Sequence, residues 1–166
     1  MMPKWIAVGI ALEKESISYY SSALKKVKDM GSIRLLEFLI DQEKEHLRFF
    51  ERLKKEKNLE KGVEAEQKKL GKMKIIKKIY SKKELNSILG KRFNVRTVFD
   101  KAIDLEEKAI LMYTNYASKS ENPKIKTFLI MLAKFENEHR KLIKSHEDAV
   151  YNSFYWDGIQ FVRLES

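Results

Sequence analysis

The sequence predicts an all-α protein, an antiparallel four-helix bundle of two helical hairpins joined by a long crossover and followed by a C-terminal tail. Three observations support this prediction. Glycine and proline together contribute 8 of 166 residues, the 6 Gly plus the 2 Pro, too few for the tight turns of a β-sandwich. Apolar residues recur with helical spacing over four long stretches. The chain also repeats itself at an offset of 93 residues, so two of these stretches are copies of the other two.

Composition indicates one domain spanning residues 1–166 and restricts its chemistry. A chain of 166 residues is long enough for one domain with its own core. The sequence contains no cysteine, which excludes disulfides, cysteine-ligated zinc, iron–sulfur clusters and thiol catalysis. Any bound metal must therefore be held by histidine and carboxylate side chains.

The chain begins with a short apolar stretch from Trp5 to Leu12. This stretch runs directly into Glu13, Lys14 and Glu15 without a small-residue cleavage site, unlike an export signal. No later stretch approaches the roughly 18 apolar residues that a membrane span needs. We therefore expect a cytoplasmic protein with no membrane partner.

The internal repeat aligns residues 9–50 with residues 102–143 without a gap. The copies share 11 identities in 42 positions, whereas roughly two or three are expected by chance. The identical pairs are Ile10 and Ile103, Leu12 and Leu105, Glu13 and Glu106, Ile17 and Ile110, Tyr20 and Tyr113, Lys26 and Lys119, Leu36 and Leu129, Leu39 and Leu132, Glu43 and Glu136, Glu45 and Glu138, and His46 and His139. Each copy therefore contains the same histidine, the same three glutamates and the same tyrosine.

The first hairpin is predicted to span approximately residues 4–57. Apolar residues keep helical spacing up to Asp29, Met30 and Gly31, where glycine is expected to end the first helix. Ser32 is then expected to cap the second helix.

The second hairpin is predicted to span approximately residues 94–150. Its turn falls at Ser120 to Pro123, with Asn122 as the helix cap and Pro123 at the first helical position. The two hairpins together give four helices of about 25 residues.

The crossover is predicted over residues 58–93 approximately, and the net positive charge of the chain is concentrated in and around it. Between Arg52 and Arg96 there are 16 basic and 5 acidic residues, a balance of +11 in a chain whose net charge is +10. Weak helical patterns run from Leu70 to Tyr80 and from Ser81 to Leu89. We expect this segment on the outside of the bundle, as a solvated face.

The tail, residues 151–166, is rich in aromatic residues. It is too apolar to stay in solvent, so it is expected either to fold back on the bundle or to pack in a dimer.

The shared polar residues are expected at one level of the bundle. Glu13 lies about 16 residues before the first turn and Glu43 about 12 after it, or roughly 24 and 18 Å along the helices. Glu43 and His46 are spaced i, i+3, so they leave the same face of one helical turn. Glu43 and His46 follow Glu13 by 30 and 33 residues, and the second copy repeats both separations after Glu106.

These glutamates stand on apolar helical stripes, as Glu43 does among leucines, Ile40 and Phe50. Burying four carboxylates together without cations is prohibitive, because like charges repel and each carboxylate loses its hydration. No arginine or lysine recurs on this stripe in both copies. Four glutamates and two histidines instead form a suitable ligand set for two divalent ions.

One glutamate from each of two helices and a Glu-x-x-His pair from each of the other two form the site of ferritin-like di-iron and di-manganese proteins. The sequence resembles the rubrerythrin branch of this superfamily over nearly its whole length. The resemblance rests on GIALEKESISYY (Gly9 to Tyr20), EKEH (Glu43 to His46), AIDLEEKAILMY (Ala102 to Tyr113) and ENEH (Glu136 to His139).

The resemblance implies two iron ions per chain, with manganese or a mixed pair as alternatives. The implied ligands are Glu13 and Glu106 as single glutamates, and Glu43 with His46 and Glu136 with His139 as pairs. Tyr20 and Tyr113, each seven residues after its glutamate, are implied to hold the ligand geometry through their hydroxyls.

Two departures limit the resemblance. Full rubrerythrins carry a cysteine-ligated rubredoxin domain, which this sequence lacks, so an external electron donor such as a rubredoxin-like protein is implied. Rubrerythrins also place an extra glutamate where this chain has Ala109, so a symmetric site of six ligands is expected. His146 lies about 10 Å along the helix from His139 and is expected at the end of the bundle.

The expected function is that of an oxidoreductase in oxidative-stress defence, in which two ferrous ions reduce hydrogen peroxide or dioxygen. An apolar wall of Ile10, Ile17, Ile103 and Ile110 is expected to exclude water from them. Ferroxidase activity for iron storage or detoxification is the alternative. Nucleic-acid binding through the crossover is disfavoured, because the segment has few aromatic residues and no recognition motif. We expect a homodimer.

Overall fold

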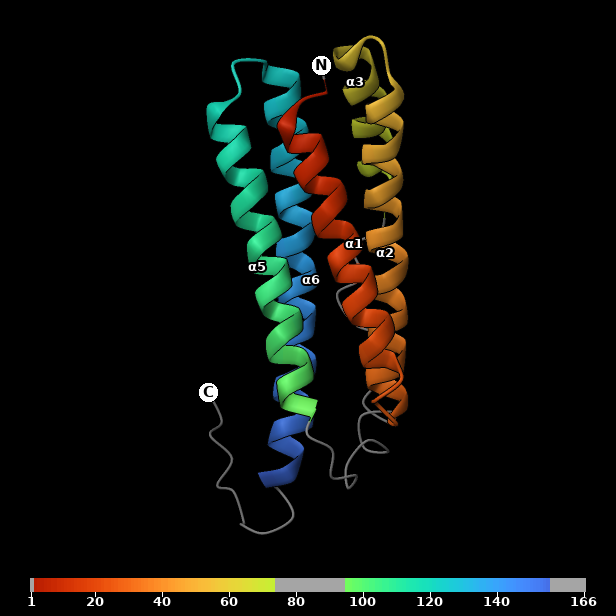
Figure 1. Cartoon of the computed structure of the whole chain (residues 1–166). Helices are drawn as coiled ribbons and strands as arrows, with labels where there is room; N and C mark the ends of the chain where they lie inside the picture. The colour runs from red at the N-terminus through yellow and green to blue at the C-terminus, as the bar shows by residue number, and fades with distance from the viewer. Residues whose placement is uncertain (1, 74–94, 156–166) are drawn as a thin grey trace.

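Five helices make up the computed structural model over the residues that it describes, 2–73 and 95–155. They are α1 (Lys4–Leu24), α2 (Met30–Lys55), α3 (Leu59–Leu70), α5 (Val95–Lys119) and α6 (Pro123–Tyr155). The four long helices lie side by side along one axis, with α3 beside one end of α2 (Figure 1). No strand occurs in these two ranges, and the predicted all-α bundle is confirmed.

The two hairpins pack as antiparallel pairs. Helices α1 and α6 run in one direction along the bundle, and α2 and α5 run in the other (Figure 1). Packing is most extensive within each hairpin, α1 against α2 and α5 against α6. Contacts of α1 with α5 and of α2 with α6 join the hairpins, so all four helices face a shared interior.

The second hairpin turns as the sequence predicts. Asn122 Oδ1 accepts hydrogen bonds from the backbone N–H groups of Lys124 (3.0 Å) and Ile125 (3.2 Å). Helix α6 begins at Pro123, which has no N–H group that would need a partner there. The cap and the first helical residue are therefore confirmed.

The first hairpin corrects one expectation. Asp29, the repeat equivalent of Asn122, caps α2 by accepting from the backbone N–H of Ser32 at 2.7 Å. The prediction of Ser32 as the cap is wrong, and Gly31 lies inside the first turn of α2 rather than ending α1, whose last residue is Leu24. The Asp29 carboxylate takes the capping position because it is a strong acceptor at a helix N-terminus.

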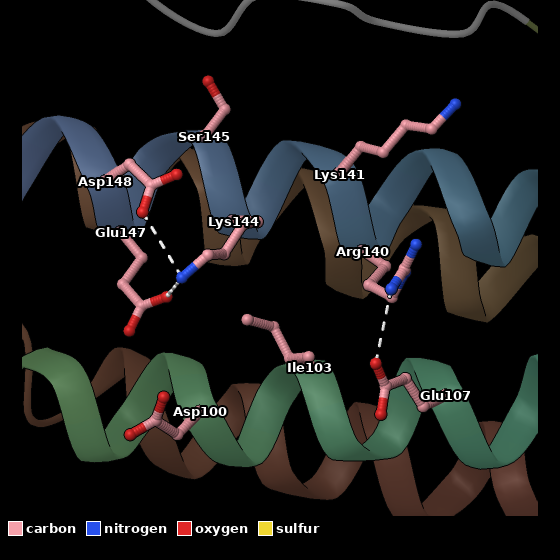
Figure 2. Close-up of a pocket in the computed structure, with 9 residues that line it drawn as sticks. All are labelled: Asp100, Ile103, Glu107, Arg140, Lys141, Lys144, Ser145, Glu147 and Asp148. Carbon is pink, nitrogen blue, oxygen red and sulfur yellow. Dashed lines mark hydrogen bonds and ion pairs between the residues drawn. The ribbon is translucent and has the colours of Figure 1, made fainter.

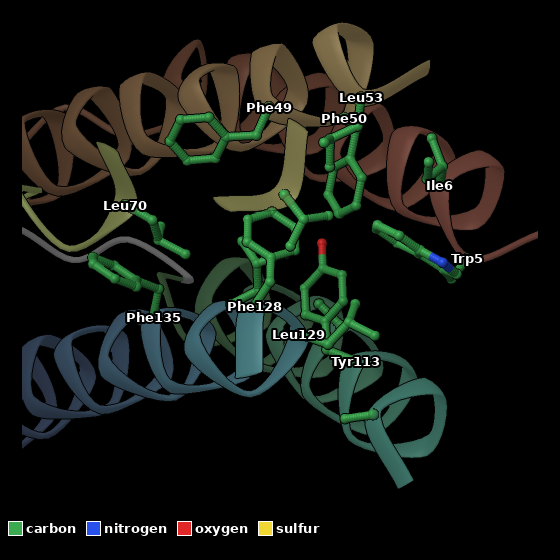
Figure 3. Close-up of a cluster of buried hydrophobic side chains, with 14 residues drawn as sticks. Trp5, Ile6, Phe49, Phe50, Leu53, Leu70, Tyr113, Phe128, Leu129 and Phe135 are labelled. Atoms are coloured by element: carbon green, nitrogen blue, oxygen red, sulfur yellow. The ribbon is translucent and has the colours of Figure 1, made fainter. Parts of the chain in front are cut away.

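The apolar core is divided into two clusters. The upper cluster, at the α3 end of the bundle, gathers aromatic residues such as Trp5, Phe50 and Phe128 around Tyr113 (Figure 3). The lower cluster contains Tyr20 and members of all four long helices. A polar layer of glutamates and histidines belongs to neither cluster, so the core supports this layer from both sides.

Helix α3 is the first part of the crossover, and it adds a packed surface that the sequence did not predict. Val63 and Leu70 are fully buried in the upper cluster. Glu66, 4% exposed, accepts two hydrogen bonds from the Arg52 guanidinium (2.9 and 2.7 Å) and one from Lys69 (2.9 Å). Arg52 of α2, at the start of the basic stretch, therefore fastens α3 to α2 through Glu66, and Lys69 supports the same carboxylate from within α3.

Two segments differ from expectation or lie beyond the description. The predicted helical piece from Leu70 to Tyr80 begins where α3 ends, and its remainder, with the piece from Ser81 to Leu89, lies outside the described residues. Helix α6 continues through Tyr155, so the first five residues of the predicted tail are helical and residues 156–166 lie outside the description. Among the described residues, no helix is long and apolar enough to cross a membrane.

Candidate metal centre

The structure brings all six predicted ligand residues together in the polar layer between the two core clusters. Each of the four long helices contributes, and each of the six residues is at most 3% exposed. The contributing residues are Glu13 from α1, Glu43 and His46 from α2, Glu106 from α5, and Glu136 and His139 from α6. The regular helices fix this level, because glutamate and histidine at i and i+3 share one face.

The six side chains form two overlapping groups whose nitrogen and carboxylate oxygen atoms lie within 4.8 Å of one another. The first group is Glu13, Glu43, His46 and Glu136, and the second is Glu43, Glu106, Glu136 and His139. Glu43 and Glu136 belong to both groups. The arrangement therefore offers two adjacent metal positions that share two carboxylates.

The two histidines direct the same ring nitrogen toward the carboxylates. His46 Nδ1 lies 3.2 Å from Glu43 Oε2 and 2.9 Å from Glu136 Oε1. His139 Nδ1 lies 3.0 Å from Glu136 Oε2 and 3.1 Å from Glu43 Oε1. The two rings stack with their centroids 5.6 Å apart. Each histidine contacts Oε2 of the glutamate on its own helix and Oε1 of the equivalent glutamate on the other helix. The site therefore has a local two-fold symmetry that relates the two repeats.

The two predicted tyrosines complete this symmetry. The Tyr20 hydroxyl donates to Glu106 Oε1 at 2.5 Å, and the Tyr113 hydroxyl donates to Glu13 Oε1. Each tyrosine thus reaches the glutamate of the other hairpin. Side chains lean toward the N-terminus of their helix, and α1 and α5 are antiparallel, so Glu13 and Glu106 lean in opposite directions along the bundle (Figure 1).

Comparison with known proteins agrees with this geometry. Residues 97–153 match the Rubrerythrin family model. The match covers most of α5 and α6, with Glu106, Glu136 and His139 among its residues. No curated protein and no solved structure matched the chain.

The predicted resemblance to rubrerythrins is therefore confirmed on the second hairpin, and the internal repeat relates the first hairpin to it. The rubrerythrin match and the buried carboxylate and histidine cluster together support a di-iron protein.

Burial and repulsion disfavour ionisation of the two single glutamates in this rubrerythrin-like site. Burial raises the pKa of Glu13 and of Glu106 well above the ordinary value of 4.5, and the nearby charge of Glu43 raises both further. Without metal, burial and the neighbouring carboxylate therefore favour the protonated form of both carboxyl groups.

The shared glutamates and the histidines form a compensating set. Burial opposes ionisation of Glu43 and Glu136, yet contacts with the two imidazolium rings lower the pKa of both carboxyl groups. Burial also favours neutral rings, but the same carboxylates raise the pKa of His46 to about 9 and that of His139 well above its ordinary value. In the metal-free site, the two imidazolium rings and these two carboxylates therefore stabilise each other's charges.

The donor set fits a pair of divalent ions. Glu43 Oε1, Glu106 Oε2 and Glu136 Oε1 are buried and accept no hydrogen bond among the described residues, although each lies within ion-pair distance of an imidazole Nδ1. Two divalent ions would carry the four positive charges that four ionised glutamates require, while both imidazoles become neutral ligands. Carboxylate oxygen with imidazole nitrogen suits iron and manganese.

The surroundings of the site correct the expected apolar wall. Ile10, Ile17, Ile103 and Ile110 are only partly buried, because they stand one position off the inward stripe of α1 and α5. The rings that touch the histidines are instead aromatic, namely Phe49 and Phe135 beside His46 and Phe38 beside His139. Sequence reasoning missed these three phenylalanines because none is identical in its repeat partner.

The positions one turn after the single glutamates are both small and buried. Ser16 follows Glu13 and is 6% exposed, and Ala109 follows Glu106 and is 5% exposed. Neither offers a carboxylate, so within the described residues the cluster has six ligand residues.

His146 stands apart from the cluster, as predicted. Its Nε2 lies 2.9 Å from Ser32 Oγ, and its ring packs edge-on against Phe99 with centroids 4.8 Å apart. Burial lowers the pKa of His146 to about 4. These contacts place His146 against the lower cluster rather than at the metal positions.

A hollow of about 670 Å³ opens on the surface between α5 and α6 (Figure 2). Its lining residues are Asp100, Ile103, Glu107, Arg140, Lys141, Lys144, Ser145, Glu147 and Asp148. Arg140 pairs with Glu107 at 3.3 Å, and Lys144 pairs with Glu147 at 2.9 Å. None of the six ligand residues lines this hollow, which is a groove of solvated ion pairs.

We predict that substitutions at Glu43 and Glu13 affect different numbers of ions. Glu43 belongs to both ligand groups, so Glu43→Gln is expected to lower the affinity for both ions by roughly 100-fold. Removing a residue that only supports a ligand already lowers metal affinity by about 10- to 100-fold, and Glu43 is itself a ligand residue. Glu13→Gln is expected to lower the affinity for only one of the two ions, because Glu13 belongs to one ligand group. Anaerobic Co²⁺ titration followed by visible absorption measures both affinities.

Glu45→Gln is the matched control, because its carboxylate lies two residues away but is 41% exposed and pairs with Arg48. Its affinities should equal those of the wild type. Equal losses in Glu13→Gln and Glu43→Gln would contradict the shared role of Glu43.

We also predict that the metal-free protein loses stability as pH rises from 6.5 to 9. The folded state raises the pKa of His46 from 6.5 to about 9, so this ring contributes stability that is complete below pH 6.5 and is lost through about pH 9. His139 acts in the same direction. Thermal unfolding in chelator should show a loss of a few kcal/mol across this range.

Adding Mn²⁺ at pH 9 should restore stability, because the ions replace the lost protons. A metal-free stability that stays constant or rises between pH 6.5 and 9 would show that the imidazolium contacts do not hold the site together.

Proposed function

We propose that this protein is an oxidoreductase in which two iron ions at the candidate metal centre reduce hydrogen peroxide or dioxygen with electrons from an external donor. The observation that carries the proposal is the sharing of Glu43 and Glu136 by two adjacent ligand groups inside the bundle. Two ions at neighbouring positions can act together on one oxidant.

Two bound ferrous ions supply two electrons, which with two protons convert one hydrogen peroxide to two waters. The protein holds these ions with oxygen ligands that tolerate both oxidation states. Glu43 and Glu136 each direct one carboxylate oxygen toward His46 and the other toward His139, so each carboxylate would be able to bind at both positions.

The tyrosines keep the single glutamates in place during this change. Burial raises the pKa of Tyr20 and of Tyr113 well above 10, and the neighbouring glutamates raise it further. Both phenols therefore stay protonated and keep donating to Glu106 and Glu13. The two core clusters above and below exclude bulk water from the ligands.

The electrons come from another molecule in this proposal. None of the 166 residues is a cysteine, so these residues cannot form an iron–sulfur or rubredoxin-type centre beside the site. A small redox protein of the rubredoxin type is the donor that we propose. Manganese can occupy the same ligands, and a di-manganese or mixed site is included in the proposal.

One observation favours a second candidate, a ferroxidase that oxidises iron for storage or detoxification. Ala109 stands where rubrerythrins carry an extra glutamate, and its repeat equivalent Ser16 offers no carboxylate either. With one carboxylate fewer, the site would stabilise the higher charge of ferric iron less, which suits release of oxidised iron.

The two functions differ in oxidant and in turnover. We predict that protein loaded anaerobically with ferrous iron is oxidised faster by hydrogen peroxide than by dioxygen in a stopped-flow experiment. With a reductant and a rubredoxin-type donor, peroxide consumption should continue for many turnovers. Glu43→Gln should abolish the fast phase, and Glu45→Gln should leave it intact.

Faster oxidation by dioxygen, with a single turnover and release of ferric iron, would reject the peroxidase and establish the ferroxidase.

A further inference from the structure

The two ligand histidines each leave one ring nitrogen unused. Their Nδ1 atoms face the carboxylates, whereas His46 Nε2 and His139 Nε2 are buried and have no hydrogen-bond partner among the described residues. A histidine that binds metal through one nitrogen almost always donates its other N–H to an acceptor, which fixes the tautomer and the ring orientation. An acceptor near these Nε2 atoms is therefore a functional feature of the site.

Each histidine ring faces the helix of the other hairpin. Phe135 of α6 stands edge-on to His46, with centroids 5.9 Å apart and an angle of 81°. Phe38 of α2 stands edge-on to His139, with centroids 6.2 Å apart and an angle of 88°. The face of α2 that carries Phe38 is thus the face that meets His139.

The repeat relates a third residue to this contact. The offset of 93 maps His46 onto His139, and it maps Gln42 onto Phe135. Because Phe135 contacts His46, applying the local two-fold symmetry of the ligands to this contact predicts Gln42 beside His139. Gln42 also lies one helical turn after Phe38, on the same face of α2.

Gln42 carries the complementary unsatisfied atom. Its Oε1 is buried and has no hydrogen-bond partner among the described residues, as is true of His139 Nε2. A buried acceptor without a donor and a buried donor without an acceptor each cost free energy, and a hydrogen bond between them removes both costs. At the equivalent place beside His46, Phe135 offers no acceptor oxygen.

We propose that Gln42 is a positioning residue for His139, and that its Oε1 accepts from His139 Nε2–H when Nδ1 binds a metal ion. This inference rests on the metal binding in the proposed function but not on peroxide reduction. The proposed hydrogen bond makes the two metal positions unequal. The ion beside His139 and Glu106 receives a more basic, better oriented imidazole than the ion beside His46 and Glu13.

The protein is suited to a direct test, because it contains only three histidines. Protein labelled with ¹⁵N-histidine and loaded with Zn²⁺, a closed-shell probe ion, reports each ring N–H separately by NMR, and a His146→Gln variant assigns the remaining signal. We expect one metal-bound ring to show a hydrogen-bonded Nε2–H. Gln42→Leu, which removes the acceptor at similar size, should shift that signal alone.

Affinity provides a second readout. In a Co²⁺ titration, Gln42→Leu should lower the affinity for one of the two ions by about 10- to 100-fold and leave the affinity for the other unchanged. Gln42→Glu keeps an acceptor oxygen and should retain both affinities. Phe135→Leu, the matched control at the equivalent position, removes no acceptor and should not shift the hydrogen-bonded signal.

Unchanged histidine signals and affinities in Gln42→Leu, with two ions still bound, would overturn the role of Gln42 and leave the proposed function intact. Equal effects of Gln42→Leu and Phe135→Leu would also overturn it, because a packing defect would then explain both. A wild-type chain that binds neither Zn²⁺ nor Co²⁺ would overturn both this inference and the proposed function. Two-ion binding without turnover of either hydrogen peroxide or dioxygen would overturn the oxidoreductase alone.

Discussion

Four carboxylates buried together require compensating positive charge, and the rest of the structure depends on this requirement. Glu13, Glu43, Glu106 and Glu136 lie between two apolar clusters where water cannot screen them. Without metal, burial and repulsion favour the protonated forms of Glu13 and Glu106, and the remaining carboxylates favour protonated rings at His46 and His139. Two divalent ions supply the same charge and use all four carboxylates as ligands. The site is therefore built to exchange protons for metal, which couples metal binding to pH and to the stability of the bundle.

The repeated hairpin meets this requirement with few different parts. Each copy supplies one glutamate, one Glu-x-x-His pair and one tyrosine, and the antiparallel pairing of α1 with α5 lets each tyrosine hold the glutamate of the other copy. The copies differ where identity is not required. Gln42 is matched by Phe135, Ser16 by Ala109 and Leu53 by His146. Of these differences, only the pair of Gln42 and Phe135 bears on the inequality that we propose between the two metal positions, because His146 stands apart from the ligands.

The sequence was sufficient to predict the bundle and the ligand layer, because both depend on periodic spacing and on residues that must be identical in the two copies. The Asn122 cap followed from local chemistry, whereas the cap of α2 was misplaced because Asp29 and Ser32 both suit that role. Helix α3 was missed because its burial depends on Val63 and Leu70 meeting distant helices. The aromatic contacts of His46 and His139 were missed for a similar reason. Phe135 and Phe38 reach across the interior from the other hairpin, and spacing along one helix does not reveal such contacts.

Anomalous X-ray diffraction from crystals soaked anaerobically in Mn²⁺ or Fe²⁺ tests the central claim most directly. The account predicts two anomalous peaks per chain, roughly 4 Å apart as in other two-metal sites, both within ligand distance of Glu43 and Glu136. One peak should also lie beside Glu13 and His46, and the other beside Glu106 and His139. A single peak, or peaks located away from Glu43 and Glu136, would contradict the claim that these shared carboxylates hold a pair of ions.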